Sequence, residues 1–352
     1  MTTAAWHGRS STSVSRPSGT LRRVLALRAD PWTPDHGMGF EVRFEETPAS
    51  ADPTVETDDW SGPVVPPAAG PGTVWFVDGV RRVELRLIAD EDGRRAPGLF
   101  GSWAVGSVRC EARAAFAEHE VGRSVVLAGG LRSGAIDVTA GRDVLSYEPA
   151  SEPGADPDAP LFGLQKRMQQ AESQLAARIA GRGEGLVLVD GRLGFLDATA
   201  SPVVGVVKRF VRAYLDAEHD ALLARLEPGE RTPLFGLVYE GQPLARYAWY
   251  ARLVPTRSAW HDHAGLVRCE VRAGVGIEEA RALADRVTAM LPGFAGRPSD
   301  PRYPQNLVPV SGLEGWLQHR MGHRGLIRRA LTAWLTQMGA PGTGAPDPGR
   351  TG

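Results

Sequence analysis

The sequence contains very little lysine and cysteine. Lys166 and Lys208 are its only lysines, although lysine and arginine together number 40. The two cysteines, Cys110 and Cys269, show neither a CxxC spacing nor a histidine at zinc-ligand spacing. This pattern argues against a structural zinc site and against a disulfide framework. We therefore expect both cysteines to be reduced residues within strands.

Long apolar runs and several familiar catalytic motifs are also missing. No run approaches the roughly 18 apolar residues of a membrane span. An apolar run follows Arg22 and Arg23, but Arg28 and Asp30 make it too short for a signal peptide. We therefore expect a soluble, cytoplasmic protein without a membrane partner. GxxxxGK[ST], GxSxG and HExxH are absent, which leaves P-loop ATPases, elbow hydrolases and zincins without support.

The overall composition is that of a globular protein with almost no net charge. Hydrophobic residues make up 42% and charged residues 23% of the 352 residues, enough for one large core or two domains. The formal net charge of −1 provides no general attraction to nucleic acid. Any site for a polyanion must therefore come from local clustering of charge.

Two short apolar runs each end in Asp-Gly. Residues 74–79 read VWFVDG and residues 186–191 read LVLVDG, so Asp78 and Asp190 follow segments typical of buried strands. Two such strands side by side would bring two carboxylates together, which is unfavourable unless a cation lies between them. Asp-Gly is also a common turn dipeptide. The pair is consistent with a metal site or with two turns.

The rest of the chain divides into a tail, a linker, a large domain and a second tail. Residues 1–45 are expected to be a partly disordered extension with a strand at 39–45, residues 46–73 a linker, and residues 339–352 a disordered tail. The domain at 74–338 carries an apparent insertion at about 113–160. The expected strands cover 74–78, 81–89, 102–112, 185–190, 233–239, 246–254 and 265–272, and the expected helices 164–179, 203–215, 219–226, 278–291 and 313–338.

The order of these elements predicts an α/β fold of the RNase H-like type. Three antiparallel strands precede a helix and a further strand, which implies a mixed sheet flanked by helices, with additional C-terminal strands and helices. In that fold the acidic metal ligands come from the first strand, the first helix and the fourth strand. Asp78, Glu172 and Asp190 occupy those places. Carboxylates without His or Cys partners suit Mg²⁺ or Mn²⁺, ions that activate water in phosphodiester hydrolysis.

Several other residues carry weaker signals. Lys208, expected on a helix, is a candidate phosphate contact or an ordinary surface lysine. The run 261–263 (HDH) suggests a metal site, but a hairpin turn is the simpler interpretation. Asp197 is expected at a turn or helix cap, and Glu84 on the solvent face of its strand.

The last predicted helix carries a basic stripe. Arg320, Arg324 and Arg328 recur at i+4 spacing, and only Glu314 opposes their charge. A basic stripe near an acidic metal centre is typical of a protein that binds the DNA backbone. A solvated amphipathic helix or an oligomer contact explains the pattern equally well.

Taken in order, these segments resemble the NurA nuclease family. The resemblance rests on residues 76–79, the helix with Glu172 before residues 186–191, the run 205–208 (GVVK), and Tyr303-Pro304 with Leu307. It implies an RNase H-like core and a Mn²⁺-dependent 5′–3′ exonuclease and endonuclease acting on DNA ends. It also implies a homodimer that docks on a hexameric HerA-type translocase during double-strand-break resection.

The resemblance further implies roles for individual residues. Asp78, Glu172 and Asp190 would be metal ligands, and Tyr303 an active-site residue. Three departures stand out. Val80 replaces the family's usual serine, the 112 positions from Asp78 to Asp190 make a long interval, and residues 310–312 (VSG) replace the Ala-His or Ala-Asp pair. The fourth metal-site member is therefore missing from its expected place.

Two alternatives to a nuclease remain open. A non-catalytic subunit that binds DNA ends or a translocase would keep the fold without turnover, and the missing fourth ligand favours it. A scaffold protein in which both Asp-Gly pairs are turns would hold the carboxylates far apart. Retention of Asp78, Glu172 and Asp190 favours the enzyme.

Overall fold

The structure is a computed structural model that describes residues 25–30, 49–68, 70, 72–194, 202–208, 214–239 and 244–339. Several expected features lie outside these residues: the tail at 1–20, the strand at 39–45, Asp197, and all but the first residue of the 339–352 tail. Among the described helices, none combines the length and the apolar composition needed to span a bilayer.

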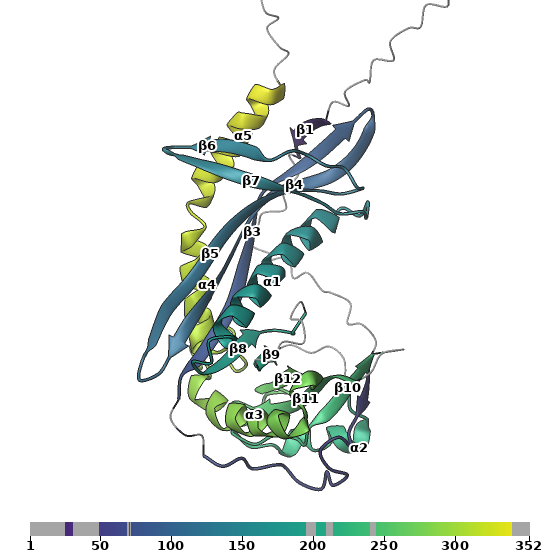
Figure 1. Ribbon diagram of the computed structural model, residues 1–352, viewed down its shortest axis with the longest axis vertical. Coiled ribbons are helices and arrows are strands. Elements are labelled where there is room, and N and C mark those ends of the chain that lie inside the picture. Colours follow the sequence, from purple (N-terminus) through teal and green to yellow (C-terminus); the bar gives the residue numbers. More distant parts are fainter. Residues whose placement is uncertain are drawn as a thin grey trace, which may run out of the picture.

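The described residues form one mixed sheet of twelve strands, with helices on both of its faces (Figure 1). The strand order is β2-β10-β11-β12-β9-β8-β3-β4-β5-β7-β6, and β1 pairs with β3 off this path. The strands are β1 (Leu25–Ala29), β2 (Ala49–Asp52), β3 (Val74–Glu91), β4 (Arg94–Cys110), β5 (Ala114–Leu127), β6 (Ile136–Ala140), β7 (Asp143–Ser151), β8 (Leu186–Asp190), β9 (Val203–Val207), β10 (Phe235–Tyr239), β11 (Leu244–Arg252) and β12 (Leu266–Arg272). The helices are α1 (Ala159–Ala180), α2 (Ala217–Asp220), α3 (Ile277–Met290), α4 (Val308–Arg320) and α5 (Arg324–Gly339), with 3-10 turns at Leu223–Arg225, Ala273–Val275 and Leu291–Phe294.

The strands β3, β4 and β5 form an antiparallel meander, but it is not composed of the three strands that were predicted: β5 lies in the expected insertion. The segments expected as two strands, 74–78 and 81–89, are one continuous strand, β3, so Asp78-Gly79 is not a turn. The turn lies at Asp92-Gly93, where φ is 55° and 82°. Positive φ at both central residues is what a tight hairpin requires. Asp78 therefore sits within a rigid strand, paired with Gly106 of β4.

The helix α1 leads into two parallel strands beside β3. The strand β8 pairs in parallel with β3, and β9 in parallel with β8, giving the order β5-β4-β3-β8-β9. This is the arrangement expected of an RNase H-like core. Residues 203–215 were expected to be helical, which is wrong for 203–207: β9 (VVGVV) is fully buried. β-Branched valines favour a sheet because their side chains pack well on the pleated surface.

The alternation of side chains along β3 assigns the helices to two faces. Trp75 and Val77 pack with α1, whereas Val74 and Phe76 pack with α3 and α4. In Figure 1, α1 crosses the meander on one side while α4 and α5 run along the other. The predicted face of α1, with Leu164, Met168, Ala171, Leu175 and Ile179, is buried as expected.

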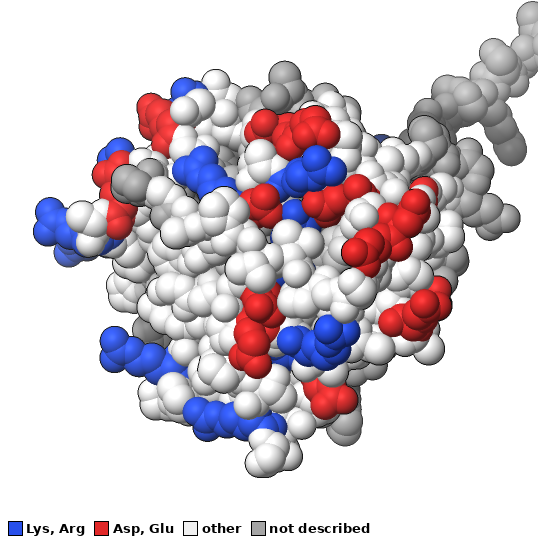
Figure 2. Space-filling model, turned by 90° about the horizontal axis from the view of Figure 1, so that it is seen from below, with Lys and Arg blue, Asp and Glu red and all other residues white. Residues whose placement is uncertain are grey.

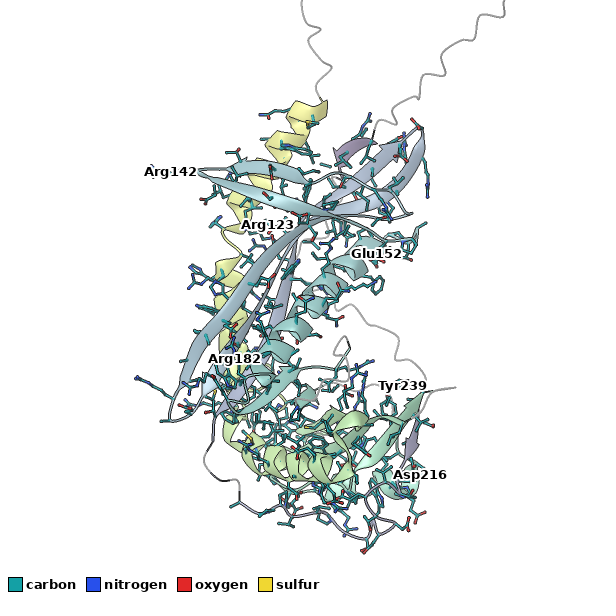
Figure 3. The ribbon with its side chains drawn as sticks, in the orientation of Figure 1. Arg123, Arg142, Glu152, Arg182, Asp216 and Tyr239 are labelled. Atoms are coloured by element: carbon teal, nitrogen blue, oxygen red, sulfur yellow. The ribbon has the colours of Figure 1, made fainter. Side chains whose placement is uncertain are left out.

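The prediction of a single final helix at 313–338 is wrong, because two helices occupy this region. The helix α4 ends at Arg320, Gly322 has a φ of 86°, and α5 begins at Arg324. Two arginines of the meander stabilise the break: Arg82 donates to the carbonyl oxygens of Met321 and Gly322. Arg123 of β5, labelled in Figure 3, donates to the Met321 carbonyl at 3.3 Å.

Glu84 belongs to the same polar cluster and does not face solvent. Its side chain is completely buried, and Oε1 accepts hydrogen bonds from Arg82 and from Ser102 Oγ. A local shift in the β3–β4 register between Val83 and Leu85 moves Glu84 out of the alternation from which solvent exposure was expected.

Residues expected as a linker or an insertion contribute to the sheet. Within 46–73, β2 pairs with β10. Within 113–160, β5 belongs to the meander and β6 and β7 extend the sheet beyond it. The strands β10, β11 and β12 and the helix α3 agree with the prediction, and β12 joins this C-terminal group to β9.

The two cysteines are free and buried, as expected. Cys110 ends β4 and Cys269 lies within β12. Burial raises the pKa of the Cys110 thiol to about 11, and burial also raises that of Cys269. Both thiols are therefore protonated at neutral pH.

A buried ion-pair network attaches the segment after β2 to the rest of the fold. Arg231, which is 1% exposed, donates to both carboxylate oxygens of Glu56 at 2.8 and 2.9 Å. It also donates to Asp285 of α3 at 2.7 Å. Glu56 accepts a further bond from the backbone N–H of Leu234 at 2.5 Å.

We expect Glu56→Ala to lower the free energy of unfolding by about 3 kcal/mol, because it leaves the buried guanidinium of Arg231 without its main partner. Chemical denaturation measures this change. Glu278→Ala is the control, since the Glu278 side chain is 82% exposed in its pair with Arg281 and should change stability by less than about 1 kcal/mol. Equal effects of the two substitutions would contradict the prediction.

Candidate metal centre

Three carboxylates from distant parts of the chain meet at one point. Asp78 of β3, Asp190 at the end of β8 and Glu314 of α4 each offer an oxygen, and these oxygens lie within 4.8 Å of one another. The sequence analysis brought Asp78 and Asp190 together correctly. It did not include Glu314 as a site residue.

The register of the sheet determines the position of the two aspartates. Val77 and Val189 are partners in the parallel β3–β8 ladder, so the next residues, Asp78 and Asp190, are neighbours that point to the same face. That face is opposite to α1 and is covered by α4. Extended backbone with paired neighbours holds the two carboxylates together whether or not their charges repel.

A glycine allows α4 to approach this face closely. Gly106, the partner of Asp78 on β4, would place a Cβ only 2.9 Å from Leu317 Cδ2 and 3.3 Å from Leu313 Cδ1. A side chain here would force these leucines, or the Glu118 carbonyl of β5 at 3.1 Å, to shift. Glu314 lies on α4 between the two leucines, so Gly106 favours the close packing that brings Glu314 to Asp78.

The burial of Asp78 makes its charge unfavourable. Asp78 is 6% exposed, and its Oδ2 is a buried atom without a hydrogen-bond partner among the described residues. Burial, followed by the charge of Asp190, raises the pKa of Asp78 well above its ordinary range; Lys208 opposes this shift and Glu314 adds to it. A buried acceptor without a donor is what a bound cation would satisfy.

Glu172 lies near the three carboxylates without joining their closest group. It comes from α1 and is 6% exposed, so its side chain is buried and does not face solvent. Burial, then Asp78 and Asp190, raise its pKa well above the ordinary range. Its carboxylate is therefore within electrostatic reach of both aspartates, although the mutual 4.8 Å contact belongs to Asp78, Asp190 and Glu314.

Two cations border the acidic group. Lys208, directly after β9, donates from Nζ to Asp190 Oδ2 at 2.9 Å. Arg302 donates from Nη1 to Glu314 Oε2 at 2.5 Å and from Nη2 to Ser311 Oγ at 2.7 Å. The expectation that Lys208 stands on a helix is wrong, because it follows a strand parallel to β8. This position explains why Lys208 reaches Asp190.

Tyr303 follows Arg302 in the chain, but its described contacts are with other residues. Its ring meets Trp260 edge-on, with centroids 5.5 Å apart, and Arg257 lies 5.6 Å from its centroid. No contact among the described residues joins Tyr303 to the three carboxylates. An active-site role for Tyr303 stays a prediction.

The basic stripe expected on one helix is divided between two. Arg320 ends α4 and lies 4.9 Å from the Trp316 ring centroid, whereas Arg324 and Arg328 belong to α5. The break at Gly322 interrupts the i+4 spacing, so the three do not form one continuous stripe. Binding of DNA by these residues also stays a prediction.

The run 261–263 lies in the turn between β11 and β12, as the simpler interpretation expected. The rings of His261 and His263 are 6.4 Å apart, and His263 Nε2 is 3.5 Å from Asp220 Oδ2.

Glu314 is an acidic member of this group that the sequence analysis did not name as a site residue. It lies two residues beyond the run 310–312. A periodic signal could have revealed it. Val310, Leu313, Leu317 and Met321 are all buried at helical spacing, and Glu314 interrupts this apolar face at i+4 from Val310. An acidic residue on the buried face of a helix calls for a partner.

The chemistry of this centre suits a hard divalent cation. All its candidate ligand atoms are carboxylate oxygens, with no histidine or cysteine among the three, which favours Mg²⁺ or Mn²⁺ over zinc. Asp78, Asp190 and Glu314 would hold the ion, while Glu172 contributes a further carboxylate within electrostatic reach of the two aspartates.

Comparison with known proteins adds a structural similarity. No family model matches the chain, and no curated protein gives a significant sequence match. Among solved structures, the NurA nuclease from Sulfolobus solfataricus is similar over 79% of this chain and 88% of that one, with a TM-score of 0.45 and 11% identity. A similarity of this size assigns neither a family nor an activity.

We expect Mn²⁺ or Mg²⁺ to stabilise the protein, because a cation offsets the repulsion among the carboxylates. At a hundredfold excess over its dissociation constant, a single ion adds about 2.7 kcal/mol. Thermal unfolding with and without each ion measures this gain. Asp78→Asn should abolish most of it, while Glu120→Gln, on an exposed part of β5, should leave it intact. A gain of equal size in Asp78→Asn would rule out the centre.

In a chelator, Asp78→Asn should be more stable than the wild type at high pH, and the difference should shrink as the pH falls. The folded protein keeps the Asp78 proton above the ordinary carboxyl pKa of about 4, whereas the unfolded chain has lost it. Stability is therefore lost as pH rises through this window. Denaturation of both proteins between about pH 5 and pH 8 tests this, and an unchanged difference would contradict it.

Proposed function

We propose that the protein is a divalent-metal-dependent nuclease that hydrolyses phosphodiester bonds in DNA. The observation that carries this proposal is the convergence of Asp78, Asp190 and Glu314 around a buried carboxylate oxygen without a donor. Acidic residues forced together inside a fold destabilise it unless they hold a cation. Such a destabilising arrangement is characteristic of a functional site.

The residues of the site have separate roles in this reaction. A divalent ion bound by the three carboxylates would supply Lewis-acid activation of water and stabilise the leaving oxygen. Burial, then the charges of Asp78 and Asp190, raise the pKa of Glu172 well above its ordinary range, so its carboxyl group would respond to the charge of an ion bound by the other three. Lys208 holds Asp190 in position and neutralises part of the charge that would repel a phosphate.

Attraction to DNA would be local. On the face seen from below, acidic and basic side chains are interspersed in small groups (Figure 2). The formal net charge of −1 likewise supports no general attraction. Phosphate would instead bind where a metal ion offsets the negative charge of the acidic centre, so DNA binding should require the ion.

The resemblance to the NurA family extends the proposal to a biological role. It suggests a Mn²⁺-dependent 5′–3′ exonuclease and endonuclease in DNA end resection and double-strand-break repair. It also suggests a homodimer associated with a HerA-type hexameric ATPase.

A non-catalytic subunit that binds DNA ends is the alternative, and the position of Glu314 counts against it. Its main argument was a missing fourth ligand, and Glu314 now stands within 4.8 Å of both aspartates. The alternative of a scaffold with two Asp-Gly turns requires the carboxylates to lie apart, and they do not.

Labelled linear DNA incubated with Mn²⁺ tests the proposal directly. We expect cleavage by the wild type and a loss of about a hundredfold or more in Asp78→Asn, Asp190→Asn and Glu314→Gln, because each removes a charged ligand from the metal. Glu120→Gln is the matched control and should cleave normally.

Two results would reject parts of this proposal. Undiminished cleavage in Asp78→Asn and Asp190→Asn would mean that the activity belongs to another site or to a contaminant. Absence of cleavage by the wild type, together with metal-dependent DNA binding, would favour the non-catalytic subunit.

A further inference from the structure

Arg302 presents a guanidinium group at the edge of the acidic centre. Nη1 donates to Glu314 Oε2 and Nη2 to Ser311 Oγ, yet 48% of the side chain remains exposed. Lys208, the other cation of the centre, is only 16% exposed in its pair with Asp190. Of these two cations, Arg302 is therefore the one with donor surface open to an incoming molecule.

The loop that carries Arg302 is held in place by its own polar network. Asp300 Oδ1 accepts from the backbone N–H of Arg302 at 2.8 Å, and Asp300 Oδ2 accepts from Asn306 Nδ2 at 2.5 Å. Asn306 is 2% exposed, and its backbone carbonyl oxygen accepts a hydrogen bond from the Gly296 N–H at 2.6 Å. The backbone at Arg302 is thus fixed, and its side chain, which reaches Glu314 and Ser311, remains about half exposed.

Binding of a metal ion changes what Arg302 can bind. Glu314 Oε2 is the acceptor of Arg302, and the Glu314 carboxylate is also one of the three candidate ligands. Coordination to a divalent cation withdraws electron density from the carboxylate and weakens it as a hydrogen-bond acceptor. The guanidinium then needs another anionic partner close by, and a phosphate held on the same ion would be that partner.

The charge balance of the centre points the same way. Asp78, Asp190, Glu314 and Glu172 in their ionised forms outnumber Lys208 and Arg302 by two charges. One divalent ion neutralises this excess and a second reverses it, so the loaded centre accepts a phosphate. Arginine suits such a ligand because its planar donors match the phosphate oxygens in a bidentate arrangement.

We propose that Arg302 is a phosphate-binding residue that pairs with Glu314 in the metal-free protein and with the DNA phosphate at the centre once metal is bound. This inference rests on the proposed nuclease function and deepens it. A residue that only positions Glu314 would contact Glu314 but not the phosphate. Substitution of such a residue would weaken metal binding, whereas substitution of a phosphate-binding residue would weaken DNA binding.

The test compares Arg302→Gln with the wild type in two assays that do not depend on cleavage. Thermal unfolding over a Mn²⁺ titration reports metal binding. Anisotropy of labelled single-stranded and double-stranded DNA in Ca²⁺ reports phosphate binding. We expect the Mn²⁺ midpoint to stay within about twofold and DNA affinity to fall about tenfold or more. The slope of log K against log salt should fall by about 1.

The matched control is Arg297→Gln, because Arg297 is an exposed arginine in the same loop. This substitution should leave the Mn²⁺ midpoint and the DNA affinity unchanged. Arg302→Lys should recover part of the DNA affinity, since it restores the charge but not the planar donors. In the cleavage assay, Arg302→Gln should raise KM about tenfold, in line with the weaker DNA binding, so that kcat/KM falls more than kcat.

Two outcomes overturn the inference. Wild-type DNA affinity in Arg302→Gln, or a weakened Mn²⁺ midpoint with activity restored by excess Mn²⁺, would make Arg302 a positioning residue for Glu314. No metal-dependent DNA binding by the wild type would also overturn it. Failure of the wild type to cleave DNA rejects the nuclease proposal alone, because the binding assays still decide the role of Arg302.

Discussion

The repulsion between the buried Asp78 and the partly buried Asp190 is the constraint on which this structure depends. Parallel pairing of β3 with β8 places Asp78 beside Asp190 on one face of the sheet, and close packing of α4 over Gly106 adds Glu314. Both features are parts of the scaffold and cannot relax without loss of core packing. The fold therefore bears a local electrostatic cost, which a divalent cation removes.

The cations around the centre moderate this cost to different degrees. Lys208 is almost enclosed and stays with Asp190, so it acts as a permanent counter-charge. Arg302 is half exposed and shares Glu314 with any ion that binds. One cation is thus part of the scaffold and the other is available for exchange of partners. The proposed nuclease would need this division of roles, because its acidic centre has to bind a polyanionic substrate.

Prediction from the sequence succeeded where local pattern and burial agree. The apolar runs before Asp78 and Asp190, the buried face of α1 and the strands β10 to β12 all follow from short-range periodicity. It failed where tertiary context decides. Residues 203–207 form a strand because a partner on each side completes a ladder, and the helix beyond residue 313 breaks at Gly322, where arginines from distant strands bind its carbonyl groups.

The amino-acid sequence by itself determined the type of chemistry: oxygen ligands without histidine or cysteine. It also predicted those elements that turn residues and apolar runs mark locally, such as α1, β8 and β10 to β12, but not β5 to β7 or β9. Only the tertiary structure decided that Glu314 completes the group and that Arg302 borders it. The reason is physical: their positions depend on how closely α4 packs against the sheet, a distance that no local pattern encodes.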